Sequence, residues 1–126
     1  MITPEAFVHY KTGNASADAA RWQIIQSAYE SVNNSADVTL VRADLRQLQE
    51  KVTIQFQREE DLFAHRSYRH WHTEDHRRIE SALSTMITKM HESMPAMYKY
   101  NIRDWVRLLT EHIESHDFQA ERDTSR

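Results

Sequence analysis

Apolar residues recur along this chain at the three- and four-residue spacing of helices that bury one face. Four stretches show the pattern, and polar or proline-containing segments separate them. Their apolar positions are Ile24, Ile25, Ala28 and Val32; then Val41, Leu45, Leu48, Val52, Phe56, Leu62 and Phe63; then Ile79, Leu83, Met86, Ile87 and Met90; and last Ile102, Trp105, Leu108, Leu109 and Ile113. The pattern predicts four amphipathic helices.

The ends of these helices carry their own signals. Asn14 or Ser16 can cap the first helix, which ends in the polar residues 33–35. The expected bounds of the others are about Asp37 to Arg66, about Trp71 to His91, and a last helix beyond Pro95. With an irregular N-terminal arm (1–13) and a polar tail (119–126), we expect one all-α domain over residues 1–126, an up-down-up-down four-helix bundle.

The composition agrees with this fold and limits the kinds of partner that we expect. The 126 residues include one glycine, two prolines and no cysteine, so hairpin turns are scarce and thiolate or disulfide chemistry is excluded. A net charge of −3 gives no general attraction to nucleic acid or an acidic membrane surface. No apolar run reaches the roughly 18 residues of a membrane span. We therefore predict a cytoplasmic protein with no nucleic-acid or membrane partner.

Several polar residues lie on the apolar stripes and are expected to point inward, where a polar group needs a partner. They are Arg21 on the first helix, Gln55 and Glu59 on the second, His72 and His76 on the third, and His112, followed by His116 and Asp117, on the fourth. In an up-down bundle, the start of the first and third helices shares one end with the finish of the second and fourth. These groups should meet at one level.

Three imidazoles and two carboxylates at one level suit a divalent iron, zinc or manganese ion. His72 and His76 are four residues apart, so both rings lie on one helix face. The alternative is a metal-free network in which histidines bond to carboxylates. The Glu-x-x-His pairs of ferritin-like di-iron proteins do not occur in this chain.

Four segments, FQREEDLF, HTEDH, HIESHD and TGNASADAAR, together resemble the hemerythrin family, from about Phe7 to Ala120. The resemblance implies a four-helix bundle with a non-haem di-iron centre that binds oxygen. It matches His72, His76 and His112 to the three histidines of one iron. It matches Glu59 and Asp117 to the two bridging carboxylates, although His116, four residues after His112, is an alternative ligand.

Two family positions differ. Arg21 and Gln55 stand where the histidines of the second iron are expected. An arginine has no lone pair to donate to a metal, but its guanidinium can form paired hydrogen bonds with carboxylates such as Glu59 and Asp117. Gln55 could complete that network. The alternative is that Arg21 and Gln55 are ordinary surface residues.

We therefore predict a hemerythrin-like, non-enzymatic metal-binding protein with one iron or zinc ion per chain, and dioxygen or another small molecule as a further ligand. One alternative is a di-iron oxygen-binding protein in which water, His65 or His70 replaces the lost ligands. Another is a metal-free structural or interaction module. The sequence does not decide the metal, its stoichiometry or the oligomeric state.

Overall fold

A computed structural model describes residues 2–33, 37–62, 69–90 and 95–117, and this part of the chain is helical without a strand. The expected all-α class is confirmed for these residues. In chain order the elements are α1 (Pro4–Phe7), the short 3₁₀ helix η1 (Val8–Tyr10), α2 (Ala15–Asn33), α3 (Val38–Leu62), α4 (Arg69–Lys89), α5 (Pro95–His112) and the π-helical turn η3 (Ile113–Asp117).

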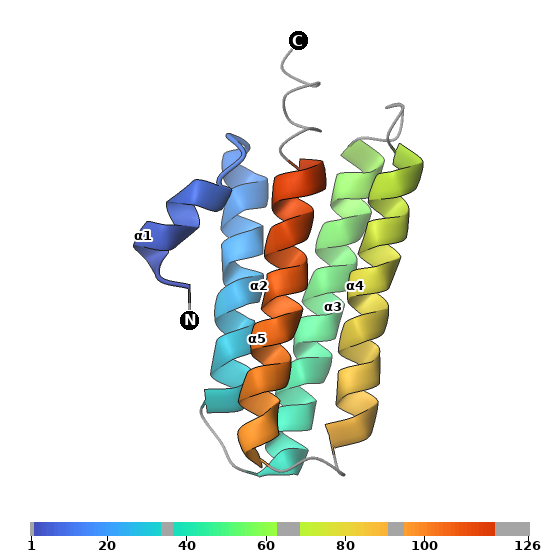
Figure 1. The fold of residues 1–126 in the computed structure, drawn as a ribbon. Coiled ribbons are helices and arrows are strands. Elements are labelled where there is room, and N and C mark those ends of the chain that lie inside the picture. The colour runs from blue at the N-terminus through green and yellow to red at the C-terminus, as the bar shows by residue number, and fades with distance from the viewer. Residues whose placement is uncertain (1, 34–36, 63–68, 91–94, 118–126) are drawn as a thin grey trace.

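The four long helices lie side by side (Figure 1). Helix α2 packs against α3 and α5, and α4 packs against the same two helices. Consecutive long helices run in opposite directions in Figure 1, so the start of α2 and α4 lies at the same end as the finish of α3 and α5. That end carries the polar residues that the sequence places on the inner faces.

The first two long helices begin where the sequence signals predict. The Asn14 side chain accepts a hydrogen bond from the backbone N–H of Ala17 at 3.1 Å, and Asp37 accepts one from Thr39 at 2.8 Å. Each cap satisfies a backbone donor that the helix itself cannot. Pro95 is the first residue of α5, where its fixed φ and missing N–H are tolerated.

The predicted apolar stripes form the core. Nearly all their described members are buried, with Met86 and Leu108 packed at its edge. The indole Nε1 of Trp105 donates a hydrogen bond to the backbone oxygen of Ile79 at 3.0 Å, which fixes α5 against α4. Leu62 is an exception, since its side chain is 56% exposed. The prediction that Leu62 continues the inner stripe is wrong, because the buried stripe of α3 ends at Glu59 within the described residues. Phe63 lies outside the described residues.

The N-terminal arm is not irregular as predicted, because it contains α1 and η1. Thr3 caps α1 by accepting a hydrogen bond from the N–H of Ala6, and Pro4 follows in the first turn. Phe7 is buried and packs on the Trp22 ring, with ring centroids 5.0 Å apart. This apolar contact holds the arm on α2. The predicted polar tail lies outside the described residues.

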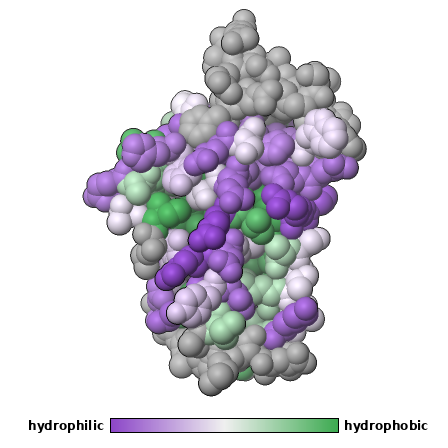
Figure 2. Space-filling model, in the orientation of Figure 1, coloured by the Kyte–Doolittle hydropathy of each residue, from purple (hydrophilic) through white to green (hydrophobic). Residues whose placement is uncertain are grey.

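The face of the molecule drawn in Figure 2 carries many hydrophilic residues, with hydrophobic patches between them. No helix within the described residues has the length and apolar character needed to cross a membrane.

Candidate metal centre

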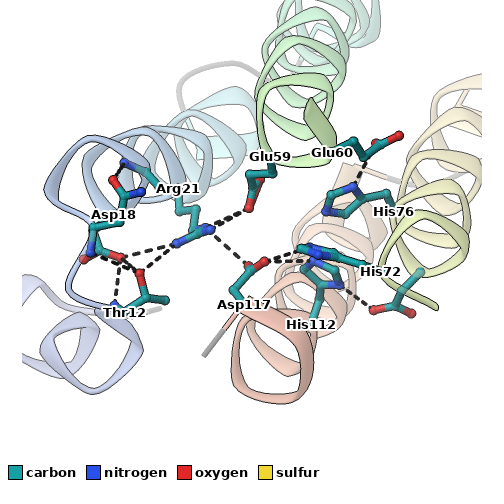
Figure 3. Close-up of polar contacts among 12 residues, drawn as sticks. Thr12, Asp18, Arg21, Glu59, Glu60, His72, His76, His112 and Asp117 are labelled. Atoms are coloured by element: carbon teal, nitrogen blue, oxygen red, sulfur yellow. Dashed lines mark hydrogen bonds and ion pairs between the residues drawn. The ribbon is translucent and has the colours of Figure 1, made fainter. Parts of the chain in front are cut away.

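Four buried side chains converge at the end of the helices where the predicted polar residues gather (Figure 3). They are His72 and His76 from α4, His112 from α5 and Asp117 from η3. Each offers one ligand atom, and these atoms lie within 4.8 Å of one another. Each residue is at most 2% exposed. The group could hold a metal ion.

The π-helical turn η3 decides which residue of the last turn enters this group. A π-helix pairs residues five apart, so Asp117 comes under His112, whereas an α-helix would bring residue 116 there. Asp117 Oδ1 lies 3.0 Å from His72 Nε2 and 3.3 Å from His112 Nε2. The side chain of His116 is 25% exposed and lies beside the group. The residue of this turn that joins the inner group is therefore Asp117, with its carboxylate, and not His116, with its imidazole.

Carboxylates outside the group orient two of its three imidazoles. Nδ1 of His76 lies 2.9 Å from Glu60 Oε2, and Nδ1 of His112 lies 2.6 Å from Asp75 Oδ2. When Nδ1 carries the proton and donates it to a carboxylate, Nε2 keeps its lone pair for a metal. Nε2 of His76 is buried and has no hydrogen-bond partner within the described part of the chain. Nε2 of His112 is also buried, and its 3.3 Å contact with Asp117 Oδ1 is an ion pair without hydrogen-bond geometry. The Phe56 ring stacks on His76 at 3.8 Å and fixes its plane.

Sequence reasoning missed Glu60 and Asp75 as orienting residues. Both lie among the charged positions of their helices and have arginine neighbours. This pattern is typical of a solvent-exposed helix face. Arg77 does pair with Glu60, and Arg78 Nη2 lies 2.7 Å from Asp75 Oδ1. Nothing in the spacing indicates that the second carboxylate oxygen of Asp75 reaches across to α5.

The other side of the centre is occupied by the Arg21 guanidinium, which is 1% exposed. Nη2 donates to Glu59 Oε1 at 2.6 Å, and Nε lies 3.3 Å from Asp117 Oδ2. Nη1 reaches Asp18 Oδ1 at 3.4 Å. Glu59 is therefore tied to Arg21 and is not a member of the histidine group, whereas Asp117 contacts both sides (Figure 3).

Asp18 and Thr12 form a support for Arg21 that the sequence did not reveal. The Asp18 carboxylate accepts three hydrogen bonds. The donors are the Thr12 backbone N–H at 2.9 Å, the Thr12 hydroxyl at 3.0 Å and the Gly13 backbone N–H at 3.2 Å. Gly13 has a φ of 98°, which glycine adopts without strain. The turn that ends the N-terminal arm thus holds the carboxylate that contacts Arg21. The sequence did contain one signal of this contact, because Asp18 and Arg21 are one helical turn apart and their side chains can pair.

Gln55 is buried on α3, one turn before Glu59. Within the described residues it makes no hydrogen bond to the Arg21 cluster, so the predicted completion of that network by Gln55 is not observed. Of the two predicted replacement ligands, His65 lies outside the described residues. His70 is in α4, but its side chain also lies outside them.

Burial and neighbouring charges shift the pKa values of the titrating groups of the centre in different directions. Burial lowers the pKa of His76 to about 2, with His112 and His72 adding to the effect. Burial also disfavours a charged His112, but Asp117 and Asp75 outweigh it and raise its pKa to about 9. Burial and Asp117 raise the pKa of Glu59 to about 8 in spite of Arg21. The pKa of Asp117 is lowered despite its burial, because His112, His72 and Arg21 favour the carboxylate.

The arrangement has the chemistry of a metal site with nitrogen donors. Neutral imidazole suits zinc, iron and copper, while a single carboxylate adds an oxygen and a negative charge. A buried Nε2 without a hydrogen bond costs about 1–3 kcal/mol, and a bound ion would satisfy it. The residues present therefore fit a transition-metal ion.

Comparison with family models, with curated proteins and with solved structures finds no match to this chain.

Proposed function

We propose that this chain is a hemerythrin-like metal-binding protein, an up-down-up-down four-helix bundle that holds one iron or zinc ion. The ligands are His72, His76, His112 and Asp117. The observation that carries the proposal is the pair of buried Nε2 atoms on His76 and His112, whose Nδ1 atoms are each bonded to a carboxylate. A carboxylate–histidine–metal arrangement is the common form of histidine ligation in proteins.

The donor set favours these ions over magnesium or calcium, which prefer oxygen ligands. Three nitrogens and one oxygen match the number of protein ligands that zinc takes in closed sites. Iron accepts more ligands, and an iron ion held here would supply a redox-active Lewis acid to which dioxygen or another small molecule can bind.

Charge balance also supports a divalent ion. Three carboxylates, those of Asp18, Glu59 and Asp117, are buried around the single guanidinium of Arg21. This leaves two uncompensated negative charges when all three are ionised. Buried charges are retained in proteins when they are paired or bound to a metal. In the metal-free protein, protons on Glu59 and His112 would supply the balance instead.

Arg21 supports one ion per chain instead of two. It contacts Glu59 and Asp117, the two carboxylates that would have to bridge a second ion. A guanidinium remains charged at any physiological pH and repels a second cation. The proposal of a single ion therefore rests on Arg21, which lies where a second ion would have to bind.

Metal analysis of purified full-length protein, loaded with iron or zinc, tests the proposal. The wild type should carry about one ion per chain, because four ligand atoms converge on one position. The variant His76→Ala should lose it, since an inner nitrogen is removed. The matched control is His9→Ala, an exposed histidine of η1 that should leave the metal content unchanged.

Each other result is informative. Two ions in the wild type would contradict the role of Arg21 and favour the di-iron alternative. No ion after loading with iron, zinc and manganese would favour the metal-free module. Equal metal content in His76→Ala and His9→Ala would show that the site lies elsewhere. The expected cytoplasmic location and the absence of enzymatic activity stay predictions.

A further inference from the structure

The four proposed ligands are almost completely enclosed, so an ion needs a path to reach them. Their exposed fractions are 2% for His72, 0% for His76 and 1% for each of His112 and Asp117. Thermal motion of the surrounding side chains must open this path. A ligand-bearing side chain that faces both solvent and the centre would capture the ion at the opening.

One edge of the centre has such side chains. Asp75, His112 and His116 form a second group whose ligand atoms lie within 4.8 Å of one another. Its outer members are half-buried, with 13% of the Asp75 side chain and 25% of the His116 side chain exposed. His112 belongs to both groups, so the outer group is continuous with the inner one.

His116 lies over the rings of two proposed ligands. Its ring is stacked on His112 with centroids 5.0 Å apart, and on His72 with centroids 5.9 Å apart. Its Nε2 lies 3.6 Å from Asp75 Oδ2, the oxygen that also contacts His112 Nδ1. This places an imidazole nitrogen and a carboxylate oxygen side by side at the border between solvent and the centre.

The arginine that pairs with Asp75 does not bind this oxygen. Arg78 binds the other carboxylate oxygen, Oδ1. The Arg78 side chain is 56% exposed, and an exposed pair of this kind contributes about 0–1 kcal/mol. An incoming cation can therefore displace Arg78 at little cost.

The opposite edge is a poorer candidate. Glu60, the carboxylate partner of His76, is also partly exposed, at 15% of its side chain. Its Oε2 contacts both His76 Nδ1 and Arg77, so the same oxygen is held by two donors. No imidazole accompanies it in a second ligand group within the described part of the chain.

We infer that Asp75 and His116 form an entry site that captures a divalent transition-metal ion and delivers it to the buried centre. The inference rests on the proposed function. His116 is then a transient ligand and is not part of the final site. An entry residue changes how fast an ion binds and how fast it leaves by the same factor, so the equilibrium affinity is unaffected.

The test measures zinc uptake by the metal-free full-length chain and zinc release from the loaded chain to an excess of a chromogenic chelator. The variant His116→Phe keeps a ring over His72 and His112 but removes both nitrogens. The variant His116→Ala removes the ring as well. His9→Phe and His9→Ala are the matched controls on an exposed histidine.

Both His116 variants should bind zinc more slowly and release it more slowly, by the same factor. Their zinc stoichiometry and dissociation constant should equal those of the wild type. Faster release with weaker affinity would make His116 a permanent ligand and overturn the inference. Faster uptake and release in His116→Ala alone would make the ring a cover, which also overturns it.

Unchanged rates in both variants would likewise refute the entry site while leaving the proposed function intact. A wild-type chain that binds no zinc and no iron would refute the proposed function itself, and the inference with it. The stoichiometry of the wild type therefore separates the two failures.

Discussion

Arg21→Met provides a demanding test of the buried charge cluster, because methionine keeps an unbranched chain and removes the guanidinium. Arg21 is 1% exposed and contacts Glu59 at 2.6 Å, Asp117 at 3.3 Å and Asp18 at 3.4 Å. The variant leaves these three carboxylates buried without their shared cation. We expect a large loss in the free energy of unfolding of the metal-free protein.

The size of the expected loss in unfolding free energy depends on the burial of Arg21 and of the three carboxylates that it contacts. Removing one partner of a buried ion pair costs about 3–5 kcal/mol, because the remaining charge stays desolvated. An exposed pair would cost about 0–1 kcal/mol. Protonation of Glu59, whose pKa burial and Asp117 already raise to about 8, relieves part of the penalty at neutral pH. The loss should lie near 3 kcal/mol at pH 7 by this scale and grow as pH rises through about 8, where Glu59 ionises.

Urea unfolding followed by far-UV circular dichroism measures this difference, provided that the denaturant slope is the same for both proteins. The matched control is Arg58→Met on α3, since Arg58 is exposed and its substitution should change stability by less than about 0.5 kcal/mol. At alkaline pH, where Glu59 is ionised, adding Glu59→Gln to Arg21→Met should restore part of the loss, because it removes one unpaired charge. An Arg21→Met loss no larger than that of Arg58→Met would refute the buried-cluster reasoning.

Three further predictions concern the metal. Glu60→Gln should lower zinc affinity about 10–100-fold by weakening the orientation of His76, measured by chelator competition, and an unchanged affinity would contradict that role. Arg21→His combined with Gln55→His should raise the iron content to two per chain while neither single change does, and a folded double variant with one ion would show that these residues do not border a second site. Zinc affinity should rise with pH until about 9 and then level off, because His112 must lose the proton that Asp117 and Asp75 stabilise despite burial; a flat profile in the same assay would exclude this competition. The same raised pKa of His112 should stabilise the metal-free protein fully below about 6.5, the unfolded value, and this contribution should disappear as pH rises through about 9.

Local chemistry in the sequence determined the helices and the level at which the polar residues gather. Asn14 and Asp37 signal helix starts because a side-chain oxygen satisfies a backbone donor only there. The four-residue spacing of His72 and His76 places both rings on one face by backbone geometry alone. These features depend on residues less than two turns apart, so the order of amino acids is sufficient to predict them.

The tertiary structure decided which side chains meet. The π-helical turn brings Asp117 inward and leaves His116 at the edge, a choice that α-helical spacing would reverse. The approach of α4 to α3 and α5 selects Glu60 and Asp75 as partners of the imidazoles. Such contacts depend on the distance between helix axes and on side-chain rotamers, which the packing of the whole core sets. A one-dimensional pattern therefore predicts that polar groups face inward, while only the packed structure determines how their hydrogen bonds and charges are shared.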